Sequence, residues 1–314
     1  MSEETESHES DAGPAYRVES VAVDGGALAV AQWGRRGPVI LAIHGLTASH
    51  REFVALADAL GDDVRMIAPD LRGRGRSNQV PGPWGMRAHA ADMVAVLEHF
   101  GVDRADAVLG HSMGAFVAAV LAADHPERCG AVVMVDGGLP IAPVIPLHRL
   151  PFGDWMIAKL VQRVLGPALD RLEMTFASRE AYRDYWREHP ALGTDWSAYI
   201  EDYLDYDLVG EAPSLRAATS RAALMSDIRA QLFENIVPAA LRRLRGPVRL
   251  LRAPRGLKDD KPLYTPAKLA KAGRSIAGFS FADVDDVNHY TIMISKRGAE
   301  AVAREVRALL GAGD

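Results

Sequence analysis

Gly110-His111-Ser112-Met113-Gly114 is the most informative stretch of this 314-residue chain, because it has the pattern Gly-x-Ser-x-Gly. The residues before it, 105–109, form a short apolar run typical of a buried strand, and residues 115–123 form a strongly apolar run that predicts a helix. In this setting the motif indicates a tight strand-to-helix turn, which exposes the serine hydroxyl at the positive end of the helix. We therefore expect Ser112 to be a nucleophile, although an ordinary turn of small residues is the alternative.

Strand and helix patterns alternate on both sides of this turn. A hairpin is expected over residues 16–33, with a turn at Asp24-Gly25-Gly26. Further strands are expected at 39–43, 64–68, 105–109, 131–135, 248–251 and 278–284, and helices near 49–60, 86–100, 115–123, after Pro266, and at 299–310. This alternation predicts an α/β fold with a mostly parallel, doubly wound, eight-stranded sheet.

Between residues 139 and 244 the alternation stops, and we find helical periodicity without a convincing strand. We therefore predict a helical cap at 139–244, inserted after the sixth strand of a core that comprises residues 14–138 and 245–314. Residues 1–13 are acidic and lack Lys and Arg, so we expect a disordered, solvated tail there.

Charge and composition exclude several classes of protein. The net charge is −5, and the five acidic residues of the tail account for it, so the rest of the chain is neutral and no nucleic-acid partner is expected. No apolar run approaches the length of a membrane span, and no secretory signal pattern opens the sequence, so we expect no membrane association. The single cysteine, Cys129, cannot form an internal disulfide, which is compatible with the cytoplasmic location that we expect. The oligomeric state stays open.

Four motifs together resemble those of the α/β-hydrolase fold family with a helical cap. They are His44-Gly45-Leu46, the segment 70–77 (DLRGRGRS), the turn around Ser112, and Asn288-His289. The resemblance covers residues 16–312, and it implies a serine hydrolase that acts by acyl transfer.

A serine hydroxyl needs a neighbouring base at neutral pH, and ten histidines could supply one. The order serine, acid, histidine along the chain places the base at His289. His111 adjoins Ser112, but successive side chains diverge at a turn. His44 lies in the segment that, by resemblance, forms part of the oxyanion hole, and His125 lies in a surface pattern. We expect His289 to be the general base.

Two positions compete for the acid that orients this histidine. In most relatives the acid follows the seventh strand, but Gly256 occupies that position here, and the nearest carboxylates are Asp259 and Asp260. Asp136 ends the sixth strand, where some branches of the family place their acid. We favour Asp136 and keep Asp259 and Asp260 as alternatives, because Asp136-Gly137-Gly138 also suits an ordinary turn.

The resemblance also implies an oxyanion hole made by the backbone N–H groups of Leu46 and Met113. We expect a largely apolar substrate pocket above Ser112, with Trp155, Trp186 and Tyr290 as candidate aromatic residues in its wall. No metal and no cofactor are expected, because no zinc-type spacing and no dinucleotide motif occur. Arg72, Arg74 and Arg76 lack a phosphate-loop pattern, so a structural turn is favoured there.

We predict hydrolysis of a small, largely apolar carboxylic ester or lactone through an acyl-enzyme on Ser112. The alternatives are a C–C bond hydrolase, a cofactor-free perhydrolase, and a receptor-like binding protein that retains the pocket. Halide removal and epoxide opening by an aspartate nucleophile are disfavoured, because a serine occupies the turn.

Overall fold

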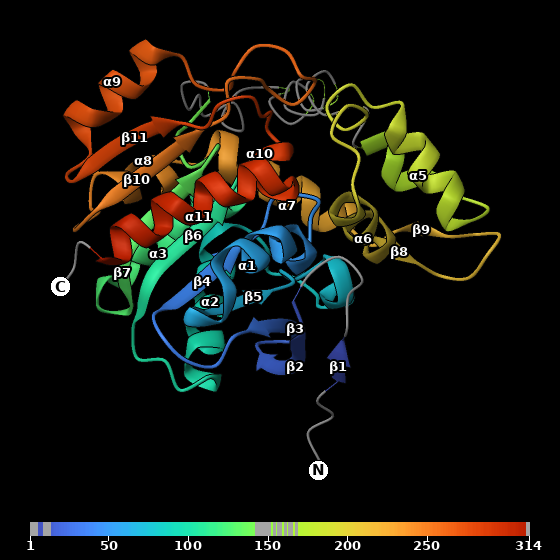
Figure 1. Ribbon diagram of the computed structural model, residues 1–314, viewed down its shortest axis with the longest axis horizontal. Coiled ribbons are helices and arrows are strands. Elements are labelled where there is room, and N and C mark those ends of the chain that lie inside the picture. The colour runs from blue at the N-terminus through green and yellow to red at the C-terminus, as the bar shows by residue number, and fades with distance from the viewer. Residues whose placement is uncertain are drawn as a thin grey trace.

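A computed structural model describes residues 6–8, 14–141, single positions between 152 and 166, and 169–311. Within these residues nine strands form one sheet in the order β1-β2-β3-β5-β4-β6-β7-β10-β11 (Figure 1). The strands are β1 (Glu6–His8), β2 (Tyr16–Val23), β3 (Gly26–Trp33), β4 (Val39–Ile43), β5 (Arg65–Pro69), β6 (Ala105–His111), β7 (Cys129–Val135), β10 (Val248–Arg252) and β11 (Phe279–Asp283). All neighbours from β5 to β11 are parallel, so the carboxyl ends of these strands meet at one edge.

The predicted eight-stranded, mostly parallel sheet is confirmed as β2 to β7 with β10 and β11. The strand β1 is an addition, because the sequence predicted a disordered tail over residues 1–13. Residues 6–8 instead pair antiparallel with residues 16–18 of β2. An edge strand carries unpaired main-chain groups, and a short extended segment can bond to them whatever its side-chain charge. The remainder of the predicted tail lies outside the described residues.

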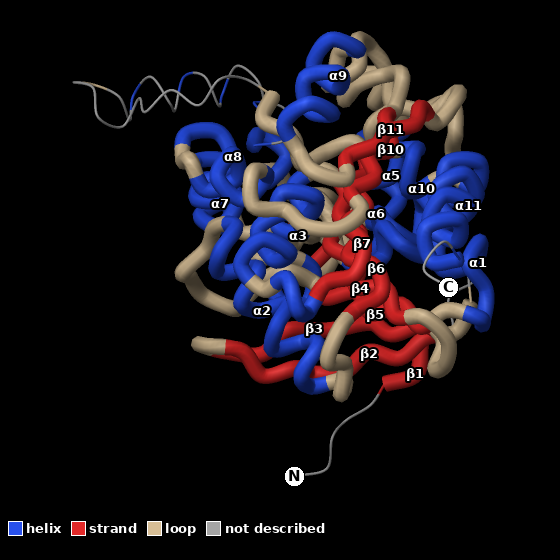
Figure 2. The backbone as a smooth tube through the Cα atoms, turned by 90° about the vertical axis from the view of Figure 1, so that its left-hand side faces the viewer, coloured by secondary structure: helices blue, strands red, loops and turns tan. Residues whose placement is uncertain are grey.

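Helices cover both faces of the sheet, as Figure 2 shows. One face carries α2 (Met86–His99), α3 (Met113–Asp124), α8 (Ile236–Leu241) and α9 (Pro266–Ser275), and the other carries α1 (Val54–Leu60), α10 (Thr291–Ile294) and α11 (Lys296–Gly311). The side chains of β4 alternate between the two cores, with Leu41 and Ile43 in one and Ile40 and Ala42 in the other. Short 3₁₀ turns occur at His50–Phe53, Gly61–Asp63, Gly75–Ser77 and Pro126–Arg128.

The segment between β7 and β10 contains the cap. Its described elements are α5 (Arg179–Arg187), α6 (Ala198–Tyr206), α7 (Arg221–Phe233), and a hairpin of β8 (Leu208–Val209) and β9 (Arg216–Ala217). The hairpin differs from the prediction of a segment without strands, because two-residue strands are too short to produce a periodic pattern. Within the range predicted as the cap, the helix α8 packs on α3 of the core.

Candidate active site

Ser112 lies at the turn between β6 and α3, at the carboxyl edge of the sheet. Its backbone has φ 50° and ψ −116°, a conformation that residues other than glycine rarely adopt. A Cβ atom added at Gly110 would clash with the main chain of Gly114, and one added at Gly114 would clash with the main chain of Ile43. The glycines of the motif are therefore required by the close approach of the backbone.

Ser112, His289 and Asp136 form one hydrogen-bonded chain. The Nε2 atom of His289 lies 3.0 Å from Ser112 Oγ, and its Nδ1 atom lies 2.7 Å from Asp136 Oδ2. A carboxylate only accepts hydrogen bonds, so Nδ1 carries the proton and Nε2 presents its lone pair to the serine hydroxyl. His289 comes from the loop between β11 and α10, and Asp136 directly follows β7. The structure thus brings together the three residues named from the sequence.

The rival acids contact other groups. Asp259 Oδ1 accepts hydrogen bonds from Arg255 Nε at 2.7 Å and from Asn288 Nδ2 at 3.0 Å. Asp260 accepts a bond from the Gly256 N–H through its main-chain oxygen at 3.1 Å. Among the hydrogen bonds of the described residues, neither carboxylate reaches the imidazole of His289, whereas Asp136 does.

The loop after β4 carries the predicted oxyanion donor, Leu46. The His44 ring fixes the start of this loop, because its Nδ1–H donates to Gly45 O at 2.8 Å and its Nε2 accepts the Leu71 N–H at 2.9 Å. Burial lowers the pKa of His44 to about 4, so the ring is neutral at pH 7, as these two bonds require. Arg74 Nε donates to Leu46 O at 3.1 Å. The Leu46 N–H and the Met113 N–H have no acceptor in the described hydrogen-bond network.

The sequence did not point to the buried pair of Glu52 and His111. Glu52 Oε2 accepts the Gly45 N–H at 3.1 Å, and Oε1 lies 2.8 Å from His111 Nδ1. The Nε2 atom of His111 lies 2.8 Å from the main-chain oxygen of His289. His111 therefore faces away from the serine hydroxyl, as expected, and contacts the main chain of His289. The adjacency of His111 to Ser112 was the one sequence signal for this pair.

A cavity of about 140 Å³ opens above Ser112, between the core and the cap. Its wall is mainly apolar, and the polar groups that reach it include Thr47, Tyr203 and Gln231. Leu46, Ile141, Ile228, Leu232, Leu257 and Leu263 supply the apolar surface.

Of the three aromatic candidates for this wall, the structure places one there. Tyr290 lines the cavity. Trp186 is buried in the cap behind it, with ring centroids 6.4 Å apart, and Trp155 is 59% exposed, with the Lys159 ammonium over its ring.

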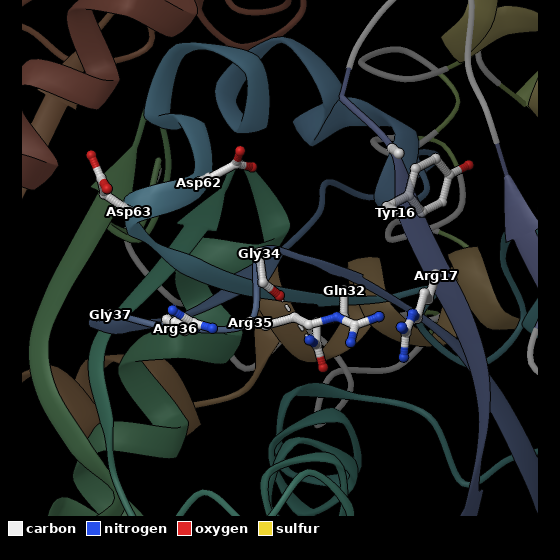
Figure 3. A pocket seen from close by; sticks show the side chains of 10 residues that line it. Tyr16, Arg17, Gln32, Gly34, Arg35, Arg36, Gly37, Asp62 and Asp63 are labelled. Carbon is white, nitrogen blue, oxygen red and sulfur yellow. Dashed lines mark hydrogen bonds between the residues drawn. The ribbon is translucent and has the colours of Figure 1, made fainter.

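A larger crevice, of about 740 Å³, lies between β2, β3 and the turn before β5 (Figure 3). Arg17, Arg35 and Arg36 border it together with Asp62 and Asp63. It adjoins the amino end of the parallel strand β5, whereas Ser112 follows the carboxyl end of β6. The crevice is therefore separate from the serine site.

Comparison with known proteins identifies the family. The sequence model described as alpha/beta hydrolase fold matches residues 38–209, more than half of the chain, so the protein belongs to the α/β-hydrolase fold family.

Among the described residues, no helix is both long and apolar enough to cross a membrane.

Several relatives carry names of hydrolases. Epoxide hydrolase B of Mycobacterium tuberculosis is 30% identical over 194 residues, which cover 60% of this chain and 51% of that protein. The chain thus spans about half the length of that relative. The 3-hydroxybutyrate-oligomer hydrolase of Cupriavidus necator is 27% identical over 277 residues, 83% of this chain and 86% of that protein. The crystal structure of E-2-(acetamidomethylene)succinate hydrolase superposes with a TM-score of 0.74 at 22% identity, over 94% of this chain and 99% of that one, which shows the shared fold.

Proposed function

We propose that the protein is a serine hydrolase that cleaves a carboxylic ester or lactone through an acyl-enzyme on Ser112. The observation that supports this proposal is the hydrogen-bonded chain from Ser112 Oγ through the His289 ring to Asp136. A nucleophile, a base and an orienting acid, hydrogen-bonded in this order, are the minimal set for acyl transfer by serine.

The proposed reaction has two halves. Ser112 Oγ attacks the carbonyl carbon while His289 Nε2 takes the hydroxyl proton, and the Asp136 carboxylate stabilises the imidazolium that forms. The Leu46 and Met113 N–H groups donate to the developing oxyanion, and each such donor is typically worth about 2.7–4 kcal/mol. The imidazolium protonates the leaving alcohol, and a water activated by His289 then releases the acid and frees Ser112.

The cavity favours a small, uncharged substrate. Its volume, about 140 Å³, lies below the roughly 300–1,000 Å³ of pockets that enclose drug-sized ligands. Among the described residues that line it there is no Lys or Arg side chain to pair with an anionic substrate group. We therefore propose short acyl groups as substrates.

The identity of the nucleophile argues against epoxide opening, despite the name of one relative. That chemistry would use an aspartate at the turn, and this chain carries Ser112 there. The relative matched over most of both chains is named as a hydrolase of 3-hydroxybutyrate oligomers, which agrees with a hydrolytic role.

Turnover of a series of p-nitrophenyl esters, from acetate to octanoate, together with a simple lactone, tests the proposal. We expect the highest kcat/KM for the shortest esters, and a fall in kcat of at least about 10⁴-fold in Ser112→Ala. The unfolding midpoint of Ser112→Ala should stay close to that of the wild type. Ester turnover by Ser112→Ala at a rate comparable to the wild type would disprove the mechanism, and product analysis would reveal C–C cleavage or peracid formation instead.

A further inference from the structure

The hydrogen bonds of His111 define its protonation state. Its Nε2 faces a carbonyl oxygen, that of His289, so this nitrogen must carry a hydrogen. Its Nδ1 faces a carboxylate oxygen of Glu52, which accepts a hydrogen bond from a protonated nitrogen. Burial alone would raise the pKa of Glu52 and lower that of His111. The attraction and hydrogen bond between the two, together with His44 and the Gly45 N–H at Glu52 and with Asp136 and the His289 main chain at His111, outweigh burial and shift both the other way. The pair is therefore a carboxylate and an imidazolium.

Glu52 is held in place by its own element. It lies in the 3₁₀ turn His50–Phe53, where the Arg51 N–H donates to the Ser49 side chain at 3.3 Å. The main chain of His50 donates to Asp70 Oδ1 at 2.8 Å, and its ring Nδ1 lies 2.9 Å from the same oxygen. Glu52 is only 4% exposed. Its carboxylate therefore sits at a fixed point beneath the cavity.

This single carboxylate contacts both halves of the proposed machinery. One oxygen holds the Gly45 N–H, next to the oxyanion donor Leu46. The other holds His111, which in turn donates to the backbone of the base, His289. A buried ion pair is on average no more stabilising than a well-packed apolar pair, so its specific contribution is the direction of its hydrogen bonds.

We propose that Glu52 is a positioning residue, which sets the oxyanion loop and the main chain of the catalytic histidine relative to each other. The proposal rests on the serine hydrolase function proposed above. It assigns Glu52 a geometric role, which depends on the reach of its side chain rather than on its charge.

Two substitutions of Glu52 separate reach from charge. In Glu52→Gln, the amide oxygen can accept the Gly45 N–H while the amide NH₂ donates to Nδ1 of a neutral His111, which still donates from Nε2 to His289 O. In Glu52→Asp, the charge stays, but the side chain is one methylene shorter and cannot hold both partners in place.

We expect Glu52→Gln to retain kcat for a short p-nitrophenyl ester within about threefold. We expect Glu52→Asp to lose about 10²-fold in kcat with little change in KM, since a displacement of about 1 Å in an active site can cost that much. Asp92→Asn is the matched control, because Asp92 is a buried carboxylate that pairs with Arg72 at 2.5 Å outside the cavity wall. Its kcat should stay within threefold of the wild type.

The outcomes distinguish this inference from the function on which it rests. Wild-type kcat in Glu52→Asp, or loss in Glu52→Gln as large as in Glu52→Asp, would overturn the positioning role while Ser112-dependent hydrolysis stands. Absence of Ser112-dependent hydrolysis in the wild type would overturn both.

Imidazole ¹⁵N NMR gives a second measurement. We expect two protonated nitrogens on His111 in the wild type and one in Glu52→Gln. A neutral wild-type ring would contradict the assigned pair.

Discussion

Asp136 has a backbone φ of 40°, which residues other than glycine rarely adopt, and it is completely buried. Its N–H donates to Leu251 O at 2.8 Å, and its Oδ1 accepts the Ala253 N–H at 3.2 Å. Leu251 lies in β10, the neighbour of β7 in the sheet, and Ala253 directly follows that strand. The sequence left Asp136, Asp259 and Asp260 in competition, because the choice depends on which strand ends are adjacent in space.

Substitution of two of the three candidate acids, Asp136 and Asp259, gives a direct comparison. We expect Asp136→Asn to lower kcat by about 10⁴-fold, because an amide no longer fixes the histidine tautomer and cannot stabilise the imidazolium. Asp259→Asn should retain kcat within about tenfold, since Asp259 bonds to Arg255 and Asn288 rather than to the imidazole. Ester hydrolysis at saturating substrate measures both. A larger loss in Asp259→Asn than in Asp136→Asn would reverse the assignment.

Glu52 shows why part of the site could not be predicted. It stands next to Phe53 in a segment predicted as an amphipathic helix, where a glutamate is normally solvent-exposed. Its partner His111 is 59 residues away in the chain. A buried polar pair of this kind produces no periodic pattern, so only the tertiary structure reveals it.

At the level of elements, α7 connects the cap to the loop after β4 that carries Leu46, the proposed oxyanion donor. Asp227 of this helix pairs with Arg74 and lies 3.0 Å from the His89 ring, and all three side chains are buried. Arg74 also donates to Leu46 O. Ile228 of the same helix lines the cavity. The ion pair of Asp227 with Arg74 therefore joins one wall of the cavity to the main chain of Leu46, the proposed oxyanion donor.

We expect Asp227→Asn to lower the free energy of unfolding by about 3–5 kcal/mol, because it leaves the buried Arg74 guanidinium without its counter-charge. KM for short esters should rise as α7 loosens over the cavity. Asp283→Asn is the control, because Asp283 pairs with Arg252 at a 42% exposed site, where such pairs contribute about 0–1 kcal/mol. Urea unfolding of both variants measures the difference, and equal effects would contradict this account of α7.

The elements that could be predicted from the sequence are those whose residues form a clear apolar run or a helical period. Apolar runs predict the helices α2 and α3 and the buried strands β4 to β7. The Gly-x-Ser-x-Gly motif predicts the tight turn at Ser112. The hairpin β8–β9, the four-residue helix α10 and the edge strand β1 are short, and their formation depends on neighbours that the local sequence does not specify. For the same reason the sequence could not predict which aromatic residues line the cavity, because whether Tyr290 or Trp186 faces it depends on how the cap packs.

At the scale of the whole molecule, two buried histidines predict how stability depends on pH. Burial lowers the pKa of His44 from 6.5 to about 4. For His111, the charges of Glu52 and Asp136 and the hydrogen bonds to Glu52 and to the main chain of His289 together outweigh burial and raise the pKa. From pH 6.5 down to 4 the unfolded chain binds a proton at His44 that the folded chain does not, so stability falls with falling pH. Above pH 6.5 the folded chain retains a proton on His111 that the unfolded chain has lost, so stability falls with rising pH.

We therefore expect the free energy of unfolding to be greatest near pH 6.5. The His44 contribution lost on the acid side is on the order of 3 kcal/mol, at 1.36 kcal/mol per pKa unit. Urea unfolding at pH 5, 6.5 and 8 measures the curve. Glu52→Gln should flatten the alkaline side, because His111 is then neutral in both states, and a wild-type stability that keeps rising from pH 6.5 to 8 would contradict the charge assigned to His111.

The fold joins residues that are distant in the sequence. Ser112 and His289 are 177 positions apart, and the parallel order of β6, β7, β10 and β11 brings their strand ends to one edge. The cap enters between β7 and β10, so it covers this edge without interrupting the sheet. The class of fold and the identities of Ser112 and His289 could therefore be proposed from motifs and chain order alone.

Covalent labelling by a fluorophosphonate, with mass spectrometric mapping of the modified peptide, tests most directly whether His289 activates Ser112. In the wild type we expect a single phosphonyl group on Ser112, and in His289→Ala a labelling rate lower by about 10³-fold, the usual contribution of a positioned general base. Modification at another residue, or an unchanged rate of Ser112 labelling in His289→Ala, would contradict the account.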